Sequence, residues 1–236
     1  MSPTIHFAGF AHYDLPHTYE IYQMKTVEGL GNLIKSPDFG GASVTMPHKL
    51  AITMHCSEVS RHAEIIGAVN TLIRDGTKEC LLFEENTDWM DLASLFSKEA
   101  RNLCGKFDTG LVIGAGGASR AALYALYKSG IEKIYLFNRT RSRAEDIAQN
   151  LKAFFKVIVL DQLDDITTNE APHVIISTVP ADKTSVALFL PVMFSQAEGI
   201  CIDMAYKPRL TPLMMAARQF ASTAWSTVPG VKVLLQ

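Results

Sequence analysis

The second half of the chain carries the clearest pattern of apolar and polar positions. In residues 105–236, short apolar runs of strand length alternate with longer stretches that have helical periodicity. Because strands that alternate with helices form parallel sheets covered on both faces, this half predicts a doubly wound α/β fold. The runs expected to form its strands are residues 109–113, 133–137, 157–160, 174–177 and 200–202.

Helices are expected between these strands and ahead of the first one. One helix covers residues 121–129 and ends before Gly130, since glycine favours the backbone conformation that follows a helix C-terminus. A second helix follows residues 138–140 and ends at Leu151. Residues 91–104 also have helical periodicity and would connect the two halves of the chain.

Residues 1–92 alternate between strand and helix more weakly. Ser2 and Pro3 are residue types favoured at the N-cap and at the first position of a helix, here at the front of the chain. A weak helix is expected at residues 27–34, ending near Pro37. The strands expected in this half are residues 18–22, 40–45, 68–73 and 80–83.

Composition and charge exclude several classes of protein. The 236 residues are 48% apolar and 19% charged, which is typical of a chain with a buried core rather than of a disordered one. The formal net charge of −2 excludes a broadly basic face for nucleic acid. No apolar stretch reaches the roughly 18 residues of a membrane span, and the first residues lack a signal-peptide pattern. We therefore expect a cytoplasmic protein with neither a nucleic-acid nor a membrane partner.

The cysteines support the same compartment. Cys56, Cys80, Cys104 and Cys201 lie far apart and show neither a CxxC pair nor a spacing typical of metal ligands. They are expected to be reduced thiols of the core, as is usual in the cytosol. The sequence predicts no metal site.

A glycine-rich loop follows the strand at residues 109–113 directly. Gly114 permits a tight turn, and Gly116 removes a side chain where a backbone would approach a pyrophosphate. Ser119 occupies the place of the usual third glycine and is small enough to pack a helix on a strand. The N–H groups of the following helix would bind the phosphates. The strand, loop and helix together predict a dinucleotide site; the alternative is a simple strand-to-helix turn.

The residues after the next strand favour NADP over NAD. An NAD site usually places a carboxylate there for the ribose 2′-hydroxyl, whereas this chain has Asn138, Arg139, Thr140 and then Arg143. Arg139 can pair with a 2′-phosphate and stack on adenine, and Thr140 can donate a further hydrogen bond. The alternative is a pair of solvated arginines at the start of a helix.

Polar clusters at residues 43–49, 67–71 and 85–88 end strand-like runs of the first half. Open α/β sheets bind ligands at such strand ends. Lys49 and Asp88, if brought together, could exchange a proton with a hydroxyl group during the oxidation of an alcohol. The spacing of the two residues does not show that they meet, and each cluster alone is typical of a surface loop.

Six motifs in this order resemble the shikimate dehydrogenase family, especially the dehydrogenase domain of fungal multifunctional shikimate-pathway proteins and their quinate-handling relatives. They are GGASVTMPHK, GAVNT, ENTDW, VIGAGGASRAA, FNRT and DMAYKPRLTPL, and they cover nearly the whole chain. The resemblance implies an α/β substrate-binding domain at residues 1–92 and a Rossmann NADP-binding domain at residues 93–236, with a cleft between them. It also implies reversible hydride transfer between NADPH and the keto carbon of 3-dehydroshikimate.

Site residues follow from the matching motif positions. Lys49 and Asp88 resemble the catalytic pair, with Lys49 exchanging the hydroxyl proton and Asp88 orienting it. The residues that resemble substrate ligands are Ser2, Thr45, Asn70, Thr87 and Tyr206. The residues that match the cofactor motifs are Gly114, Gly116, Gly117, Asn138, Arg139, Thr140, Arg143, Ser177, Thr178 and Val179.

The chain departs from the family pattern at both ends. It begins at Met1-Ser2-Pro3, so the family's first strand and a preceding serine are expected to be missing. After residues 230–235 the family continues into a final helix, and this helix is also expected to be missing. It carries a substrate-binding glutamine that would fall one residue beyond Gln236, so Gln236 receives no role. Phe7 and Glu84-Glu85 replace the family's more usual residues, whereas Trp89 agrees with the fungal type.

Three functions remain open at this point. The first is an active NADP-dependent dehydrogenase of shikimate or a related cyclic hydroxy acid. The second is a catalytically impaired relative that senses a pathway metabolite and regulates, which the departures at the two ends would favour. The third is a copy recruited to secondary metabolism. All three predict a small-molecule partner, and the sequence sets no oligomeric state.

Overall fold

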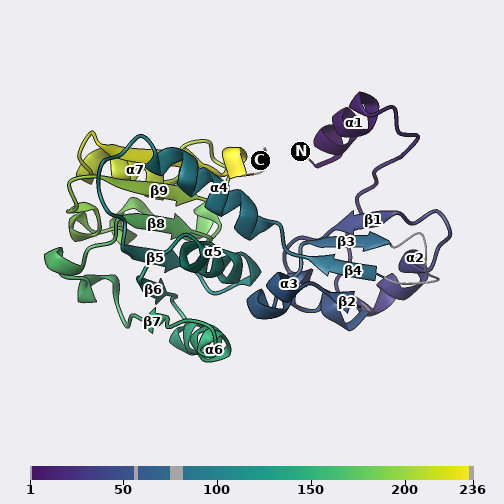
Figure 1. Cartoon of the computed structure of the whole chain (residues 1–236), viewed down its shortest axis with the longest axis horizontal. Helices are drawn as coiled ribbons and strands as arrows, with labels where there is room; N and C mark the ends of the chain where they lie inside the picture. The colour runs from purple at the N-terminus through teal and green to yellow at the C-terminus, as the bar shows by residue number, and fades with distance from the viewer. Residues whose placement is uncertain (1, 56–57, 75–81, 234–236) are drawn as a thin grey trace. The chain divides into compact units, whose positions relative to one another are not determined.

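The computed structural model describes residues 2–55, 58–74 and 82–233. The chain forms two compact units, Met1–Phe39 and Gly40–Gln236, and each is described by itself. Figure 1 shows the course of the chain from its N-terminus to its C-terminus. The domain extents of 1–92 and 93–236 stay a prediction.

The first unit contains short helices without a described strand. The helix α1 (Ser2–His12) begins at the front of the chain as predicted, and η1 (Glu28–Leu30) and α2 (Gly31–Ile34) confirm the weak second helix. The strand predicted at residues 18–22 is wrong, because the segment has no regular structure and no described strand of its unit pairs with it. Its Tyr19 instead stacks on His6, with ring centroids 4.2 Å apart.

The second unit opens with a four-stranded sheet in the order β1-β3-β4-β2. The strand β3 pairs antiparallel with β1 and β4, and β2 pairs parallel with β4. Between β2 and β3 lies the helix α3 (Arg61–Ile66), which is capped by Ser60 and ends at Gly67, where φ is +65°. The bounds are Gly41–Ser43 for β1, Glu58–Val59 for β2, Thr71–Arg74 for β3 and Leu82–Glu85 for β4.

The predicted strands of this sheet form at shifted positions. The run at residues 68–73 begins its ladder only at Thr71, because the N–H of Val69 donates to the carbonyl of Lys49 in the 3-10 helix η2 and not to a neighbouring strand. The strand predicted at residues 80–83 is β4, and residues 80 and 81 lie outside the described residues. The short elements β2 and α3 were not predicted. The 3-10 helices η2 (His48–Leu50) and η3 (Ile52–His55) follow β1.

A six-stranded sheet forms the rest of the second unit, in the order β10-β9-β8-β5-β6-β7 with every pair parallel. From β5 the chain first moves outward to β6 and β7, and then returns to place β8, β9 and β10 on the other side (Figure 1). This order is that of a dinucleotide-binding Rossmann sheet, so the predicted fold class is confirmed. The bounds are Thr109–Ile113 for β5, Lys133–Phe137 for β6, Ile158–Val159 for β7, Val174–Ser177 for β8, Gly199–Asp203 for β9 and Trp225–Pro229 for β10.

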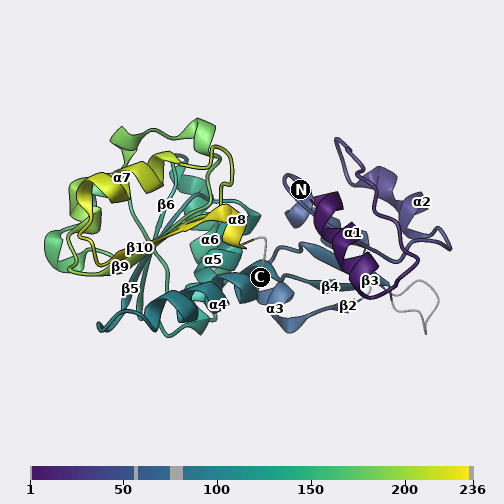
Figure 2. The ribbon, with the colours of Figure 1, turned by 90° about the horizontal axis from the view of Figure 1, so that it is seen from above.

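Helices and turns cover both faces of this sheet. Val112 of β5 lies in a core cluster with side chains of α4, α5 and α6, whereas its neighbours Leu111 and Ile113 lie in a second cluster with α7 and several 3-10 helices. Figure 2 shows α7 apart from α4 and α5 across the sheet. The bounds are Asp88–Ala100 for α4, Gly117–Lys128 for α5, Arg141–Leu151 for α6, Pro212–Phe220 for α7, Gly230–Val233 for α8, Leu163–Asp165 for η4, Thr168–Glu170 for η5, Ala181–Lys183 for η6, Val186–Leu188 for η7 and Pro191–Phe194 for η8.

Further expectations concern helices and cysteines. The prediction that the final helix is missing is wrong, since α8 begins at Gly230, directly after β10. The helix α5 begins at Gly117, four residues earlier than predicted, so half of the glycine-rich loop is helical. Cys201 is free and buried as expected, whereas Cys104 is free but exposed, which corrects the prediction of a core thiol there. Cys56 and Cys80 lie outside the described residues. Over the part of the chain that the structure describes, no helix has the length and apolar character needed to cross a membrane.

Candidate active site

Lys49 and Asp88 meet in the second unit. Lys49 lies in η2, just after β1, and Asp88 is the first residue of α4, just after β4. The Lys49 Nζ donates to Asp88 Oδ2 at 2.5 Å, and each side chain keeps 16% of its surface exposed. The pairing that the sequence spacing did not show is therefore formed, between two side chains that are largely but not wholly buried.

Asn70 and Thr87 complete a polar cluster around Asp88. The Asn70 Nδ2 donates to Asp88 Oδ1 at 2.8 Å and to Thr87 Oγ1 at 3.0 Å. The N–H of Thr87 donates back to Asn70 Oδ1 at 2.9 Å. Thr45 lies in the loop between β1 and η2, and its side chain is exposed. The structure brings Asn70 and Thr87 to the lysine–carboxylate pair, while a ligand role for Thr45 stays a prediction.

The two other predicted substrate residues lie elsewhere. Ser2 begins α1 in the first unit, and its role stays a prediction. Tyr206 follows β9 with 46% of its surface exposed. Its segment is anchored by Asp203, a buried carboxylate that accepts the N–H of Ala205 at 3.0 Å. Burial raises the pKa of Asp203, and hydrogen bonds from Thr211 and the Ala205 backbone oppose this rise.

The glycine-rich loop lies where β5 and β8 end side by side. Gly114 has a φ of +115°, and a Cβ there would overlap the hydroxyl of Thr178. Ser119 is fully buried and its hydroxyl lies 2.7 Å from that of Thr178, so it fills the position of the usual third glycine. This edge is the point where the strand order reverses, which is the ligand-binding point of open α/β sheets. Ser177 is buried at the end of β8, and Thr178 and Val179 follow it half-buried.

The same loop contacts Lys49. A Cβ on Gly117 would lie 3.0 Å from Cβ of Lys49 and 3.4 Å from its Cδ. A Cβ on Gly116 would meet no atom within 4 Å. Gly116 thus leaves open space, as a bound pyrophosphate requires, whereas Gly117 lets the aliphatic stem of the lysine pack on the start of α5.

We expect Gly117→Ala to destabilise the protein by about 1–3 kcal/mol, because the added methyl group presses on a stem whose far end is held by Asp88. Gly116→Ala is the matched control. Its backbone is extended (φ −117°, ψ −170°) and its surroundings are open, so we expect a change within about 0.5 kcal/mol. Urea unfolding of both variants measures the difference. Equal stabilities would show that the contact with Lys49 imposes no constraint.

Basic residues gather at the end of β6. Arg139, Thr140 and Arg143 are exposed, and the Asn138 Nδ2 donates to the carbonyl of Thr140 at 2.8 Å. Arg141 between them is engaged by carboxylates, since it donates to Glu145 at 2.7 Å and pairs with Asp161. Within the described residues no carboxylate pairs with Arg139 or Arg143, so their guanidinium groups are available to an anion.

Arg120 and Asp91 were missed by the sequence analysis. The Arg120 Nη1 donates to the carbonyl of Ile66 at 3.4 Å, at the end of α3, and burial lowers the pKa of Arg120. Asp91 is half-buried one helical turn after Asp88. Its burial, followed by the charge of Asp88, raises the pKa of Asp91 to about 6. The repeated carboxylate at a spacing of three on a helix could have indicated this repulsion.

We expect Asp91→Asn to stabilise the protein at pH 7.5 and to leave it nearly unchanged at pH 4. Because the folded-state pKa of Asp91 is above its ordinary value, the folded state binds more protons between about pH 4 and pH 6, and stability falls as the pH rises through that window. The gain is on the order of 1 kcal/mol, since solvent screens a half-exposed group. Thermal unfolding at both pH values measures it. Asp164→Asn, on an exposed turn, should change neither value, and an equal gain at pH 4 would refute the electrostatic cause.

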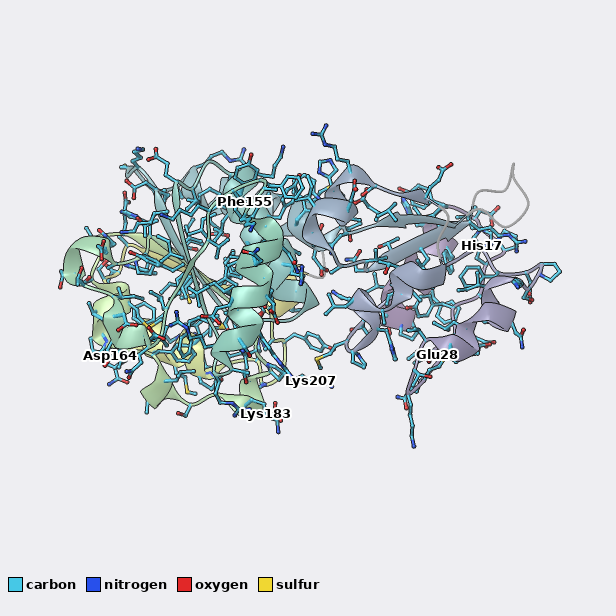
Figure 3. All side chains as sticks on the ribbon, turned by 90° about the horizontal axis from the view of Figure 1, so that it is seen from below. His17, Glu28, Phe155, Asp164, Lys183 and Lys207 are labelled. Atoms are coloured by element: carbon cyan, nitrogen blue, oxygen red, sulfur yellow. The ribbon has the colours of Figure 1, made fainter. Side chains whose placement is uncertain are left out.

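Aromatic side chains pack against one another around the helices of the second unit. For example, Tyr127 of α5 stacks on Phe155, labelled in Figure 3, with ring centroids 4.5 Å apart. Trp89 packs between His62 and Tyr124, and the His62 Nδ1 lies 2.8 Å from the Tyr124 hydroxyl. These aromatic contacts join α3, α4 and α5 directly behind Asp88. No cluster of possible metal ligands occurs among the residues with described placement.

Comparison with known proteins points in one direction. The family described as "Shikimate dehydrogenase substrate binding domain" matches residues 1–72, and the family described as "Shikimate / quinate 5-dehydrogenase" matches residues 98–206. The pentafunctional AROM polypeptide of Mycosarcoma maydis is 38% identical over 269 residues, which cover 100% of this chain and 16% of that protein. The one from Malassezia globosa is 41% identical over 244 residues, which cover 99% of this chain and 15% of that protein. The chain thus spans a small part of these curated relatives.

Solved structures with the same fold support this similarity. The dehydroquinate dehydratase and shikimate dehydrogenase from S. pombe AroM matches with a TM-score of 0.78 and 34% identity, over 99% of this chain and 45% of that chain. A shikimate 5-dehydrogenase from Thermus thermophilus, in complex with NADP(H) and shikimate, matches with a TM-score of 0.78 and 27% identity, over 99% of this chain and 83% of that chain.

Proposed function

Because the chain belongs to the shikimate dehydrogenase family, we propose that it is an NADP-dependent oxidoreductase that interconverts 3-dehydroshikimate and shikimate, or a closely related cyclic keto and hydroxy acid. The observation that carries this proposal is the Lys49–Asp88 pair, whose Nζ and Oδ2 atoms lie 2.5 Å apart. Gly117, the first helical residue of the glycine-rich loop, packs on the stem of Lys49. A proton donor and a dinucleotide-binding loop thereby border the same site.

The residues of this chain supply the acid–base part of the reaction. In the direction of reduction, Lys49 Nζ donates a proton to the oxygen of the substrate carbonyl as that carbon becomes a secondary alcohol. In the reverse direction, the same nitrogen accepts the hydroxyl proton. Asp88 holds the nitrogen in place and balances its charge. A positioned acid–base group of this kind contributes about 10²–10⁴-fold to a rate.

The loop geometry fits NADP. This cofactor, when bound, supplies or accepts the hydride. Gly114 and Gly116 leave room for its pyrophosphate at the N-terminus of α5, where free N–H groups favour an anion. Arg139 and Arg143, with Asn138 and Thr140, would hold the 2′-phosphate. Ser177, Thr178 and Val179, at the end of β8, would border the nicotinamide.

The substrate residues follow the same reasoning. Thr87 lies beside Asp88 and offers a hydroxyl group to a polyhydroxylated ring, and Asn70 borders the same carboxylate. Ser2, Thr45 and Tyr206 are proposed to bind the remaining polar groups of the substrate. We further propose that the protein works in the cytoplasm, in the biosynthesis of aromatic compounds. A metabolite sensor or a copy recruited to secondary metabolism is not favoured, since a sensor needs no assembled lysine–carboxylate pair.

The test is a direct assay of the purified protein. We expect NADP⁺ reduction that depends on shikimate, with a smaller rate for quinate, and a much lower rate with NAD⁺ in place of NADP⁺. Activity with quinate but not with shikimate would identify a different substrate within the same class of cyclic hydroxy acids. If neither acid supports reduction of either cofactor, the proposed function is wrong.

A further inference from the structure

We propose that Asp203 and Thr211 are positioning residues for Tyr206, because the Asp203 carboxylate accepts hydrogen bonds from both ends of the loop at residues 204–210 that carries this tyrosine. We call these two hydrogen bonds, from the Ala205 N–H and from the Thr211 hydroxyl, the loop tie. The inference rests on the proposed function, in which Tyr206 binds the substrate. Asp203 and Thr211 are 2% and 0% exposed, so they act through the loop.

The loop begins at the sheet edge that also carries the glycine-rich loop. Asp203 is the last residue of β9 and lies opposite Ser177 of β8, and β8 pairs in turn with β5. The N–H of Met204 donates to the carbonyl of Ser177 at 2.9 Å, so the first residue of the loop still follows the sheet. Tyr206 therefore lies close in sequence to the edge that borders the proposed cofactor site.

The start of the loop is held by the carboxylate and by α8. Asp203 Oδ1 accepts the N–H of Ala205 at 3.0 Å. Gly230, the first residue of α8, lies against the same stretch of backbone. A Cβ on Gly230 would lie 2.5 Å from the carbonyl oxygen of Met204 and 2.7 Å from that of Ala205, so the backbone packs more closely than any side chain would allow.

The end of the loop is held by the same carboxylate. Thr211 is the N-cap of α7, and its hydroxyl oxygen accepts the N–H of Met214 at 3.3 Å. Burial raises the pKa of Asp203, and the hydrogen bond from Thr211 opposes this rise, as a hydroxyl that donates to a carboxylate does. The hydroxyl of Thr211 thus joins α7 to Asp203, while residues 206–209 lie exposed between the two held ends.

The loop tie controls affinity through the population of the ordered loop. A ligand that binds only the ordered loop has an apparent affinity proportional to the fraction of molecules in which the loop is in place. Loss of one hydrogen bond lowers this fraction by at most the factor that the bond contributes to the ordered loop. Because Tyr206 is proposed to hold the substrate before and during the reaction alike, the loss is expected in KM and not in kcat.

The test compares Thr211→Val with Thr211→Ser by steady-state kinetics. Valine keeps the shape of threonine and removes the hydroxyl, whereas serine keeps the hydroxyl. We expect Thr211→Val to raise the KM for shikimate about 3- to 10-fold, the effect of one hydrogen bond, with kcat and the Kd for NADP⁺ nearly unchanged. Thr211→Ser should keep a KM close to that of the wild type. Equal KM values in the two variants would overturn the inference.

The matched control is Thr184→Val. It removes a hydroxyl that donates to the carbonyl of Ala181 at 3.2 Å, after η6, and it should leave kcat and KM unchanged. Asp203→Ala breaks the loop tie from its other end while Thr211 still caps α7, so it should raise the KM at least as much as Thr211→Val. A wild-type KM in Asp203→Ala would overturn the inference, since the effect of Thr211→Val would then come from the cap.

A double-mutant comparison tests whether the loop tie acts through Tyr206. In a Tyr206→Ala background the side chain that the loop presents is gone, so Thr211→Val should raise the KM no further. An increase of the same size in both backgrounds would overturn the inference, because the loop tie would then act on the substrate independently of the tyrosine.

Hydrogen exchange of the wild-type protein tests the loop tie without turnover. The amide of Ala205 donates to a buried carboxylate and should exchange with solvent much more slowly than that of Lys207 in the middle of the loop. Equal exchange of the two amides would refute the loop tie, whatever the activity. A protected Ala205 amide in a protein that oxidises neither shikimate nor quinate would instead refute the proposed function and leave the loop tie intact.

Discussion

Lys49→Met is expected to lower kcat for shikimate oxidation by about 10²–10⁴-fold, while the Kd for NADP⁺ stays close to that of the wild type. The ammonium group lies 2.5 Å from Asp88 and is the proton donor and acceptor that the proposed reaction uses. Methionine retains an apolar stem of similar length, so the packing on Gly117 is preserved and the chemical group alone is lost. Steady-state kinetics measures kcat, and isothermal titration with NADP⁺ measures the Kd.

The control for this substitution is Lys106→Met. Lys106 also pairs with a carboxylate, Glu132 at 3.0 Å, but its side chain is 72% exposed and lies away from the glycine loop. It should keep wild-type kinetics. Turnover of Lys49→Met within a few-fold of the wild type would mean that another group, or water, exchanges the proton, and the catalytic role of the pair would be abandoned.

Arg139→Asp is expected to raise the Kd for NADP⁺ about 100-fold or more and to change the Kd for NAD⁺ far less. A charge-assisted pair with a 2′-phosphate is worth about 1.5–3 kcal/mol, and the introduced carboxylate adds repulsion that only the phosphorylated cofactor meets. NAD⁺ lacks this phosphate, so its binding tests the rest of the site. Isothermal titration with both cofactors gives the ratio directly.

Arg141→Gln is the control for the loss of a positive charge close to Arg139. It removes a positive charge two residues away, from a side chain that Glu145 and Asp161 already engage. We expect little change in NADP⁺ affinity and a slightly lower Tm, since the ion pairs are largely exposed. Parallel losses of NADP⁺ and NAD⁺ in Arg139→Asp would contradict the phosphate assignment, because they would indicate damage to the loop as a whole.

The fold could be predicted well where strands are buried on both faces. The strands at residues 109–113 and 133–137 occur with the predicted bounds because a parallel strand covered on both sides is continuously apolar and ends at a turn. The strand β10 was missed, since Ser226 and Thr227 interrupt its apolar run at the edge of the sheet. Residues 18–22 were wrongly predicted as a strand. Their residue types favour a strand, but a strand forms only when a neighbouring strand pairs with it.

The sequence predicted which residues belong to the candidate site better than it predicted how they contact one another. The cofactor loop follows from local sequence, because glycine positions and a strand–helix junction are local features. The contact between Lys49 and Asp88 joins residues 39 positions apart, so only the family resemblance paired them. Asp91 and Arg120 escaped notice because their importance arises from burial and from hydrogen-bond partners, which a single sequence does not display.

The absence of a side chain at position 117 links two design choices that would otherwise be independent. A protein engineer who wants to retune coenzyme preference can vary the exposed positions 139 and 143, but any larger residue at position 117 pushes on the stem of Lys49. Libraries that vary positions 139, 143 and 117 together should therefore return diverse residues at the first two and glycine at the third. Changing the coenzyme side of this protein without harming its proton chemistry requires leaving that one position untouched.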